Sequence, residues 1–160
     1  MPKLRTSSSK CDPLVRVVVA ILLVITGLAM NLASAADAPL SVRPENLKWF
    51  GPPGNPALQG AWVIGSEQKP GAYILRVRLA AGGRIPPHTH PDERNSTVLS
   101  GTIYVGFGTT FDEAKMIPIP AGGVYVAPAN VPHYVWARDG DAVYQEAGVG
   151  PTATALVERE

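Results

Sequence analysis

Three histidines are the residues of this chain whose type and spacing point most directly to chemistry. They are His88, His90 and His133, and the sequence contains no other histidine. Residues i and i+2 of an extended strand point to the same face, so His88 and His90 can share one ligand. His133 is the natural third ligand, because it follows a proline-containing turn and opens a strand-like stretch. Neutral imidazole binds divalent transition metals. The pattern predicts one such ion, with iron, manganese, nickel, copper and zinc all compatible.

The elements that must position these histidines are short apolar runs separated by turn signals. This pattern is typical of an all-β sandwich or barrel. Apolar and polar residues alternate from 73 to 80, which predicts a half-buried antiparallel strand. Asp139-Gly140 is a two-residue hairpin signal, and a helical turn is expected over 111–115. Eight or nine strands in about 125 residues favour a compact double-stranded β-barrel. The other expected strands are 60–65, 96–107, 115–118, 123–127, 133–138, 142–147 and 153–157.

The segments around the histidines resemble the two motifs of the cupin family. Gly82-Gly83-Arg84-Ile85-Pro86-Pro87-His88-Thr89-His90, followed by Gly101, resembles the first motif. Gly122, followed after five residues by Pro128-Ala129-Asn130-Val131-Pro132-His133, resembles the second. The chain from about 45 to 157 is similar to small exported single-domain cupins. The resemblance implies an all-β, double-stranded β-helix fold, the cupin jelly-roll barrel. It selects no reaction, because cupins carry many.

One departure from the first motif concerns a ligand. The resemblance places a glutamate ligand seven residues before Gly101, where this chain has Arg94. Glu93 stands one residue earlier, and a one-residue displacement turns a strand side chain to the other face unless a turn absorbs it. Two alternatives stay open: Glu93 as a fourth ligand, with Asp92 the lesser candidate, or three histidines alone. In the ligand register, Arg94 could hold a carboxylate or enolate substrate.

Further pocket candidates are Ser96, on the strand after the histidine pair, and the aromatic residues Tyr125 and Trp136. Asn130 replaces the glycine of the second motif in a turn expected to need a positive φ. We therefore predict a metal-binding cupin, a mononuclear oxygenase or lyase acting on a small oxygenated organic molecule. The alternative is a non-catalytic cupin that binds a metal or a small solute in the periplasm.

The first 35 residues have the features of a signal peptide. Basic residues precede an apolar run over 17–30, which is shorter than the roughly 20 residues that cross a bilayer. Ala33-Ser34-Ala35 offers a cleavage site, so we expect an exported protein, periplasmic or secreted, with no stable membrane span after cleavage. Residues 36–58 are expected to form an irregular arm held by Trp49 and Phe50, and 59–160 the cupin domain.

Cleavage after Ala35 would also change the charge and the cysteine content. It removes four basic residues and one acidic residue, which takes the formal net charge from +1 to −2. It removes Cys11, the only cysteine, so thiol chemistry is excluded for the mature chain. The slightly acidic balance makes nucleic acid a poor partner. We expect a small-molecule ligand and, by analogy with other cupins, a homodimer.

Overall fold

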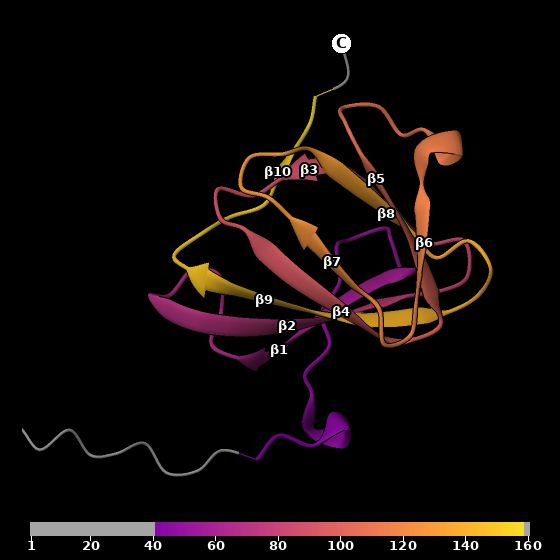
Figure 1. Ribbon diagram of the computed structural model, residues 1–160. Helices are drawn as coiled ribbons and strands as arrows, with labels where there is room; N and C mark the ends of the chain where they lie inside the picture. Colours follow the sequence, from indigo (N-terminus) through magenta and orange to yellow (C-terminus); the bar gives the residue numbers. More distant parts are fainter. Residues whose placement is uncertain (1–40, 159–160) are drawn as a thin grey trace, which may run out of the picture. The chain divides into compact units, whose positions relative to one another are not determined.

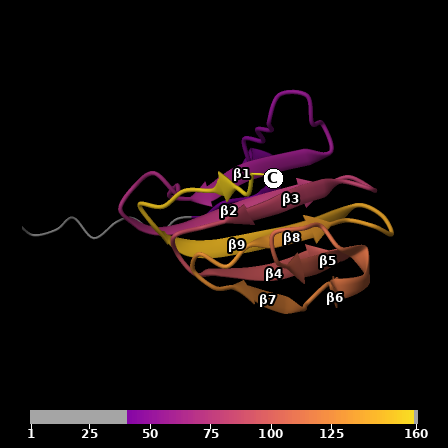
Figure 2. The same cartoon turned by 90° about the horizontal axis from the view of Figure 1, so that it is seen from above.

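The computed structural model describes residues 41–158, which form two five-stranded antiparallel sheets facing one another (Figure 1). Consecutive strands cross repeatedly between the sheets, as Figure 2 shows from above, and this arrangement confirms the all-β, double-stranded β-helix fold. In spatial order, the first sheet contains β1 (Leu58–Ile64), β2 (Gly71–Leu79), β9 (Ala142–Gly150), β4 (Arg94–Ser100) and β7 (Val124–Ala127). The second contains β10 (Ala155–Leu156), β3 (Arg84–Thr89), β8 (His133–Trp136), β5 (Thr102–Phe107) and β6 (Ile117–Pro120).

The interior between the sheets changes from apolar to polar along the strands. Side chains of a strand alternate between its two faces, so Val98 of β4 is buried on the same face as Ser96 and Arg94. On β9, the buried residues likewise run from Tyr144 to Glu146. One end of the barrel is therefore an apolar core, and the other end collects buried polar and charged groups. The core includes Val77, Leu79, Val98, Ile103, Val105 and Val135.

The segment 96–107 differs from the single strand that its apolar pattern predicts. It forms two strands, β4 and β5, which belong to different sheets. Gly101 separates them with a φ of +71°, and a Cβ there would lie 2.2 Å from the carbonyl oxygen of Asp141. Only glycine combines this backbone conformation with so close an approach. The chain therefore turns from one sheet into the other at Gly101.

The hairpin expected at Asp139-Gly140 is wrong, because β8 and β9 on either side of it lie in different sheets. A crossing between sheets uses the same turn residues as a hairpin, so the sequence signal does not separate the two. The positive φ expected at Asn130 is confirmed, with a value of 61°. The helical turn expected over 111–115 is confirmed as a short 3-10 helix, η3 (Glu113–Lys115).

The arm before β1 contains one further 3-10 turn, η2 (Pro44–Asn46), and is attached to the first sheet by aromatic residues. The ring of Phe50 stacks on Trp62 at 6.1 Å, and its backbone bridges to Gly60. Trp49 lies under the guanidinium of Arg78 at 4.0 Å. The predicted signal peptide and its cleavage site lie outside the described residues. Within 41–158, no helix has the length and apolar character needed to cross a membrane.

Candidate metal centre

The three histidines of the sequence meet at the polar end of the barrel. His88 lies on β3 and is the register partner of His133, the first residue of β8, while His90 follows the end of β3. One ring nitrogen from each lies within 4.8 Å of the other two. The side chains are almost completely buried, with relative exposures of 5%, 3% and 0% for His88, His90 and His133. These residues could hold one metal ion.

Backbone carbonyls fix the orientation of all three imidazoles. The Nδ1 of His88 lies 2.8 Å from the carbonyl oxygen of Pro86, and that of His133 lies 3.2 Å from the carbonyl of Val131. A carbonyl only accepts hydrogen bonds, so each Nδ1 carries the proton and each Nε2 keeps its lone pair. The Nε2 atoms of His90 and His133 are buried without a hydrogen-bond partner among the described residues. This is the arrangement that a metal ion would satisfy.

The electrostatic surroundings keep the imidazoles neutral. Burial, with the neighbouring His133 as the second cause, lowers the pKa of His88 to about 4. Burial and the positive charge of Arg94 lower the pKa of His90 to about 3, and the same two causes lower the pKa of His133. A metal ligand must be deprotonated. The three side chains are therefore ready to bind a metal at neutral pH without releasing protons.

These lowered pKa values predict a metal affinity that changes much less between pH 7.5 and 5.5 than that of a site of ordinary histidines. An imidazole with the ordinary pKa of about 6.5 is mostly protonated at pH 5.5 and would weaken binding about tenfold per ligand. For this site we expect the Kd for Zn²⁺, measured by competition with a chelator, to differ by less than about tenfold between the two pH values. A loss of about a thousandfold would show that the histidines titrate normally.

Glu93, expected as a candidate fourth ligand, is not brought to the histidines. Its side chain is exposed, and its carboxylate is not part of the cluster. The turn at 91–92 leads directly into β4, whose first residue, Arg94, points inward with 1% exposure. Glu93 stands immediately before β4, and its exposed side chain points away from the interior that Arg94 enters. Of the two alternatives left open by the sequence, the described residues bring together the three histidines alone.

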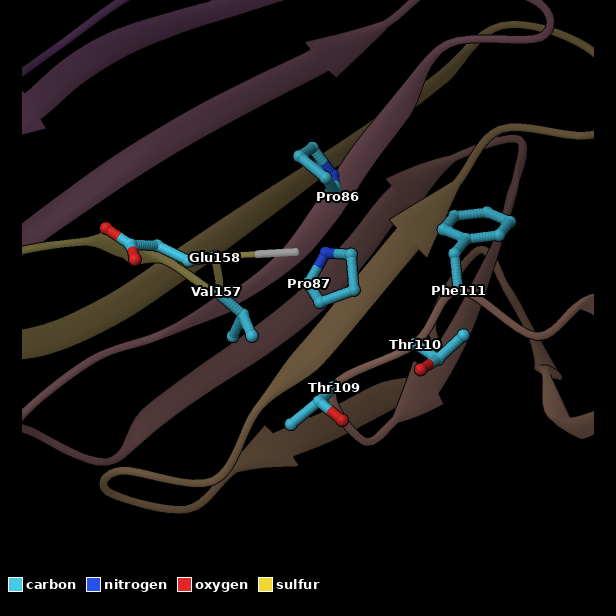
Figure 3. Close-up of a pocket in the computed structure, with 7 residues that line it drawn as sticks. All are labelled: Pro86, Pro87, Thr109, Thr110, Phe111, Val157 and Glu158. Carbon is cyan, nitrogen blue, oxygen red and sulfur yellow. The ribbon is translucent and has the colours of Figure 1, made fainter. Parts of the chain in front are cut away.

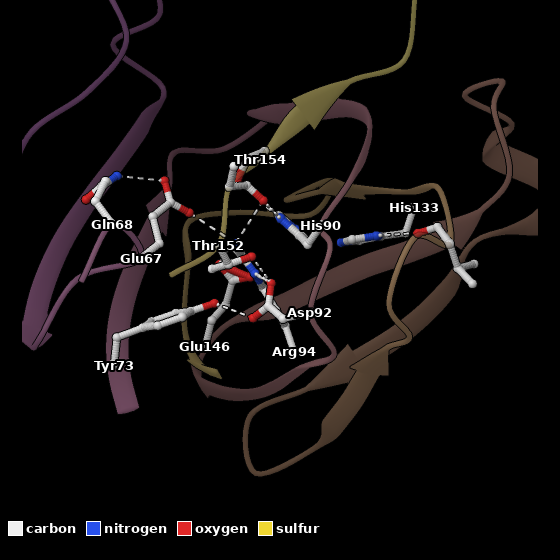
Figure 4. Close-up of polar contacts among 12 residues, drawn as sticks. Glu67, Gln68, Tyr73, His90, Asp92, Arg94, His133, Glu146, Thr152 and Thr154 are labelled. Carbon is white, nitrogen blue, oxygen red and sulfur yellow. Dashed lines mark hydrogen bonds and ion pairs between the residues drawn. The ribbon is translucent and has the colours of Figure 1, made fainter. Parts of the chain in front are cut away.

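Arg94 lies in the register of the missing ligand but is paired with the chain's own carboxylates (Figure 4). Its Nη2 lies 3.0 Å from Oε2 of Glu67, and its Nε lies 3.4 Å from Oδ1 of Asp92. Nη1 lies 4.0 Å from Oε1 of Glu146. The guanidinium therefore does not stand free to hold a substrate carboxylate, as its register alone suggested. It balances buried negative charge beside the histidines.

The C-terminal segment, residues 151–157, covers His90 and connects it to the charged cluster. The Nδ1 of His90 lies 3.3 Å from the carbonyl oxygen of Ala153 and 3.2 Å from Oγ1 of Thr154. The same Ala153 carbonyl accepts a hydrogen bond from Arg94 at 3.3 Å. Thr152 donates a hydrogen bond to Asp92, and β10 pairs with β3 beside His88. Residues 151–157 thus hold the ring of His90 in place.

We expect Thr154→Val to weaken metal binding by about tenfold, because it removes one of the two oxygens that orient His90. Valine keeps the shape of threonine, so the free energy of unfolding of the metal-free protein should change little. Zn²⁺ competition and chemical unfolding measure the two effects separately. An unchanged Zn²⁺ affinity would show that the Ala153 carbonyl alone orients the ring.

Of the three remaining pocket candidates, two line the polar interior. Ser96 has 0% exposure and Tyr125 has 7%, and they are register partners on β4 and β7. Trp136 lies elsewhere: three residues after His133 on β8, it points to the opposite face. There it contacts Phe111 at 6.3 Å and lies under Arg84 at 4.2 Å. Trp136 is therefore not brought together with the histidines.

Two surface grooves lie around the loop between β5 and η3. The larger, about 680 Å³, is lined by residues including Pro86, Pro87 and Phe111 (Figure 3). The smaller, about 470 Å³, runs from Phe107 to Lys115. Neither is lined by a histidine. The chemistry of the residues, and not the size of a groove, identifies the candidate site.

The sequence reasoning missed Glu146 and Glu67. For Glu146 a signal was present, because it is two residues after Tyr144 in an alternating strand and so shares the buried face. A carboxylate on such a face is unusual and points to a site. For Glu67 there was no such signal, since it comes from the loop between β1 and β2 and reaches Arg94 only through the fold.

Comparison with known proteins agrees with the resemblance drawn from the sequence. Residues 75–145 match the family model described as Cupin domain. Germin-like protein 1-1 from Oryza sativa subsp. japonica is 34% identical over 113 residues, which cover 67% of this chain and 48% of that protein. Germin-like protein 5-1 from the same plant is 42% identical over 83 residues, covering 47% and 38%. The chain therefore spans about half or less of the length of these curated relatives.

Two solved structures extend the likeness over most of the described residues. The polyketide cyclase RemF from Streptomyces resistomycificus has a TM-score of 0.64 and 16% identity, covering 77% of this chain and 88% of its own. A conserved protein with a double-stranded β-helix domain from Klebsiella pneumoniae has a TM-score of 0.59 and 17% identity, covering 77% and 100%. At these identities the likeness concerns the fold.

Proposed function

Because the chain belongs to the cupin superfamily and brings three imidazoles together, we propose that it is a metal-dependent oxygenase or lyase acting on a small oxygenated organic molecule. The observation that carries the proposal is the unpaired Nε2 of His90 and of His133, buried beside His88. Three protein ligands leave coordination positions for a substrate or water, as in catalytic metal sites.

The histidines and Arg94 have different roles in the proposed function. The histidines supply three neutral nitrogen donors, which backbone carbonyls hold in one orientation. Arg94 places a positive charge near all three rings, which favours a negatively charged substrate oxygen. When bound, the metal would act as a Lewis acid that stabilises developing charge on that oxygen. Burial excludes bulk water and strengthens these interactions.

The test is turnover by protein loaded separately with Fe²⁺, Mn²⁺, Ni²⁺, Cu²⁺ and Zn²⁺. Each form is assayed against panels of diketones, catechols and oxoacids, with oxygen consumption and product analysis as readouts. We expect one metal to support turnover with one panel, and the metal-free protein to support none. Stoichiometric metal without turnover on any panel would contradict an enzymatic function.

The second candidate is a non-catalytic protein that captures a metal or a small solute. The near-complete burial of the three histidines favours it, because a metal there has little contact with solvent. The rate of metal release distinguishes the capture protein from the enzyme. A capture protein should hold Zn²⁺ for hours against excess chelator, whereas an enzyme needs an accessible coordination position.

We propose that the protein acts after export, as a soluble homodimer in the periplasm or outside the cell, on the basis of its N-terminal residues and its family. Protein recovered from the exported fraction should begin at Ala36, and sedimentation should give twice the mass of the mature chain. A chain that retains Met1 in that fraction would contradict cleavage of a signal peptide. A protein that sediments as a monomer would contradict the homodimer.

A further inference from the structure

A row of three polar side chains crosses the first sheet at the level of the histidines. Tyr125 of β7 is the register partner of Ser96 of β4, and Ser96 is the register partner of Glu146 of β9. Directly opposite residues of neighbouring strands point to the same face. All three are buried, with exposures of 7%, 0% and 6%, so that face is the inner one. We call Ser96, Tyr125 and Glu146 the polar row.

The polar row and the histidines line the same interior. The ring centroid of Tyr125 lies 6.4 Å from that of His133, although the two residues belong to different sheets. Arg94 precedes Ser96 by two residues, so it shares the inner face of β4. Its charge lowers the pKa of all three histidines. The row therefore forms the wall opposite the imidazoles.

The hydroxyl groups of the row have no hydrogen-bond partner. Within residues 41–158, the Oγ of Ser96 and the hydroxyl of Tyr125 are buried and unpaired. The hydroxyls of Ser96 and of Tyr144 both lie close to that of Tyr125, but outside hydrogen-bond geometry. A buried hydroxyl without a partner costs about 1–3 kcal/mol. A ligand that accepts hydrogen bonds would remove this cost.

The carboxyl group of Glu146 is also weakly engaged. Its Oε1 lies 4.0 Å from Nη1 of Arg94, which exceeds hydrogen-bond distance. The stronger contacts of Arg94 go to Glu67 and Asp92, at 3.0 and 3.4 Å. Arg94 thus leaves the carboxyl group of Glu146 incompletely neutralised in a buried place.

We propose that the polar row binds a small carboxylate whose oxygen also occupies an open position on the metal of the three-histidine site. The hydroxyls of Ser96 and Tyr125 donate to the carboxylate, and the protonated carboxyl group of Glu146 is a third donor. The positive charge of Arg94 favours the anion. This inference rests on the proposed metal binding, and it names the ligand class of that site.

The test uses protein loaded with Co²⁺ and titrated with acetate, with the visible spectrum of Co²⁺ as the readout. Tyr125→Phe and Ser96→Ala should each weaken acetate binding by about tenfold, because each loses one hydrogen bond to a charged group. Both should keep Co²⁺ affinity within about twofold, since neither is a ligand. The control is Tyr134→Phe: this buried tyrosine donates its hydroxyl to the Asp112 carbonyl, away from the row, so acetate binding should be unchanged.

The outcomes separate this inference from the proposed metal binding. Acetate binding that is unchanged in Tyr125→Phe and in Ser96→Ala, with Co²⁺ bound normally, would overturn the polar row and leave the metal centre in place. Failure of the wild-type protein to bind Co²⁺ would overturn both. An equal loss of acetate binding in Tyr134→Phe would overturn the row as well, because it would assign the effect to general destabilisation.

Glu146 adds a pH readout that a merely structural role would not produce. Burial raises its pKa to about 7. Arg94 opposes that rise, while Glu67 and Asp92 reinforce it. The tyrosines that face it, Tyr73, Tyr125 and Tyr144, have raised pKa values and stay neutral. As the pH rises through 7, Glu146 loses its proton and becomes a negative charge beside the bound anion.

Acetate binding to the wild-type protein should therefore weaken by about tenfold or more between pH 6 and pH 8.5. Glu146→Gln keeps a donor but does not titrate, so its acetate affinity should change much less over this range. Any ionisation of metal-bound water is common to both proteins and cancels in the comparison. Identical pH profiles for the two proteins would overturn the role of Glu146.

Discussion

Replacing Arg94 by methionine should lower the free energy of unfolding of the metal-free protein by about 3–5 kcal/mol, the largest effect on stability that we expect. The substitution removes the positive partner from a buried cluster and leaves the carboxylates of Glu67, Asp92 and Glu146 without it. Urea unfolding at pH 7.5 measures the loss. At about pH 5 the loss of free energy of unfolding should be smaller, because Glu146 is then protonated and neutral and is no longer stabilised by the positive charge of Arg94.

The matched control is Arg84→Met. Arg84 forms an ion pair with Glu113 at 2.8 Å, but both side chains are about half exposed. Exposed pairs contribute less than about 1 kcal/mol. If Arg94→Met is too unstable to purify, Arg94→Lys takes its place, because it keeps the positive charge without the planar guanidinium group. Its free energy of unfolding should lie between those of Arg94→Met and Arg84→Met. A loss of less than about 1 kcal/mol in Arg94→Met would contradict a structural role for this cluster.

Replacing His133 by asparagine should weaken metal binding by more than about 100-fold, the largest effect on affinity that we expect. His133 is fully buried and supplies one of only three nitrogen donors. Asparagine is of similar polarity and cannot reach the position of Nε2. The Kd for Zn²⁺ by chelator competition gives the result, and circular dichroism shows whether the fold is kept.

Glu93→Gln is the control for this substitution, because it removes the carboxylate expected from the family motif. The exposed position of Glu93 predicts a Zn²⁺ affinity within about twofold of the wild-type value. A large loss of affinity in Glu93→Gln would mean that this carboxylate moves to the metal. A small loss in His133→Asn would mean that the metal binds elsewhere.

The three histidines and the fold could be predicted from the sequence, and the reasons are physical. His88 and His90 share a face because a strand has a period of two residues, and His133 follows a motif with proline turns. The positive φ of Asn130 followed from the conformational freedom that asparagine shares with glycine. These features are local, so a single sequence displays them.

The features that could not be predicted from the sequence depend on contacts between distant segments of the chain. The outward turn of Glu93 follows from the inward position of Arg94, and that position requires Glu67 and Glu146 to arrive from two other parts of the chain. The division of 96–107 into two strands depends on the contact between Gly101 and Asp141. No local pattern encodes such contacts. The C-terminal segment beside His90 could not be placed for the same reason.

We infer that three imidazoles, without a protein carboxylate, form one metal site. Mature protein purified without a histidine tag, loaded with Zn²⁺ and freed of excess metal, tests it most directly. Elemental analysis with X-ray absorption at the zinc edge should give one zinc per chain and three imidazole ligands. A protein carboxylate among the ligands, abolished by Glu93→Gln, or a stoichiometry near zero would contradict the claim.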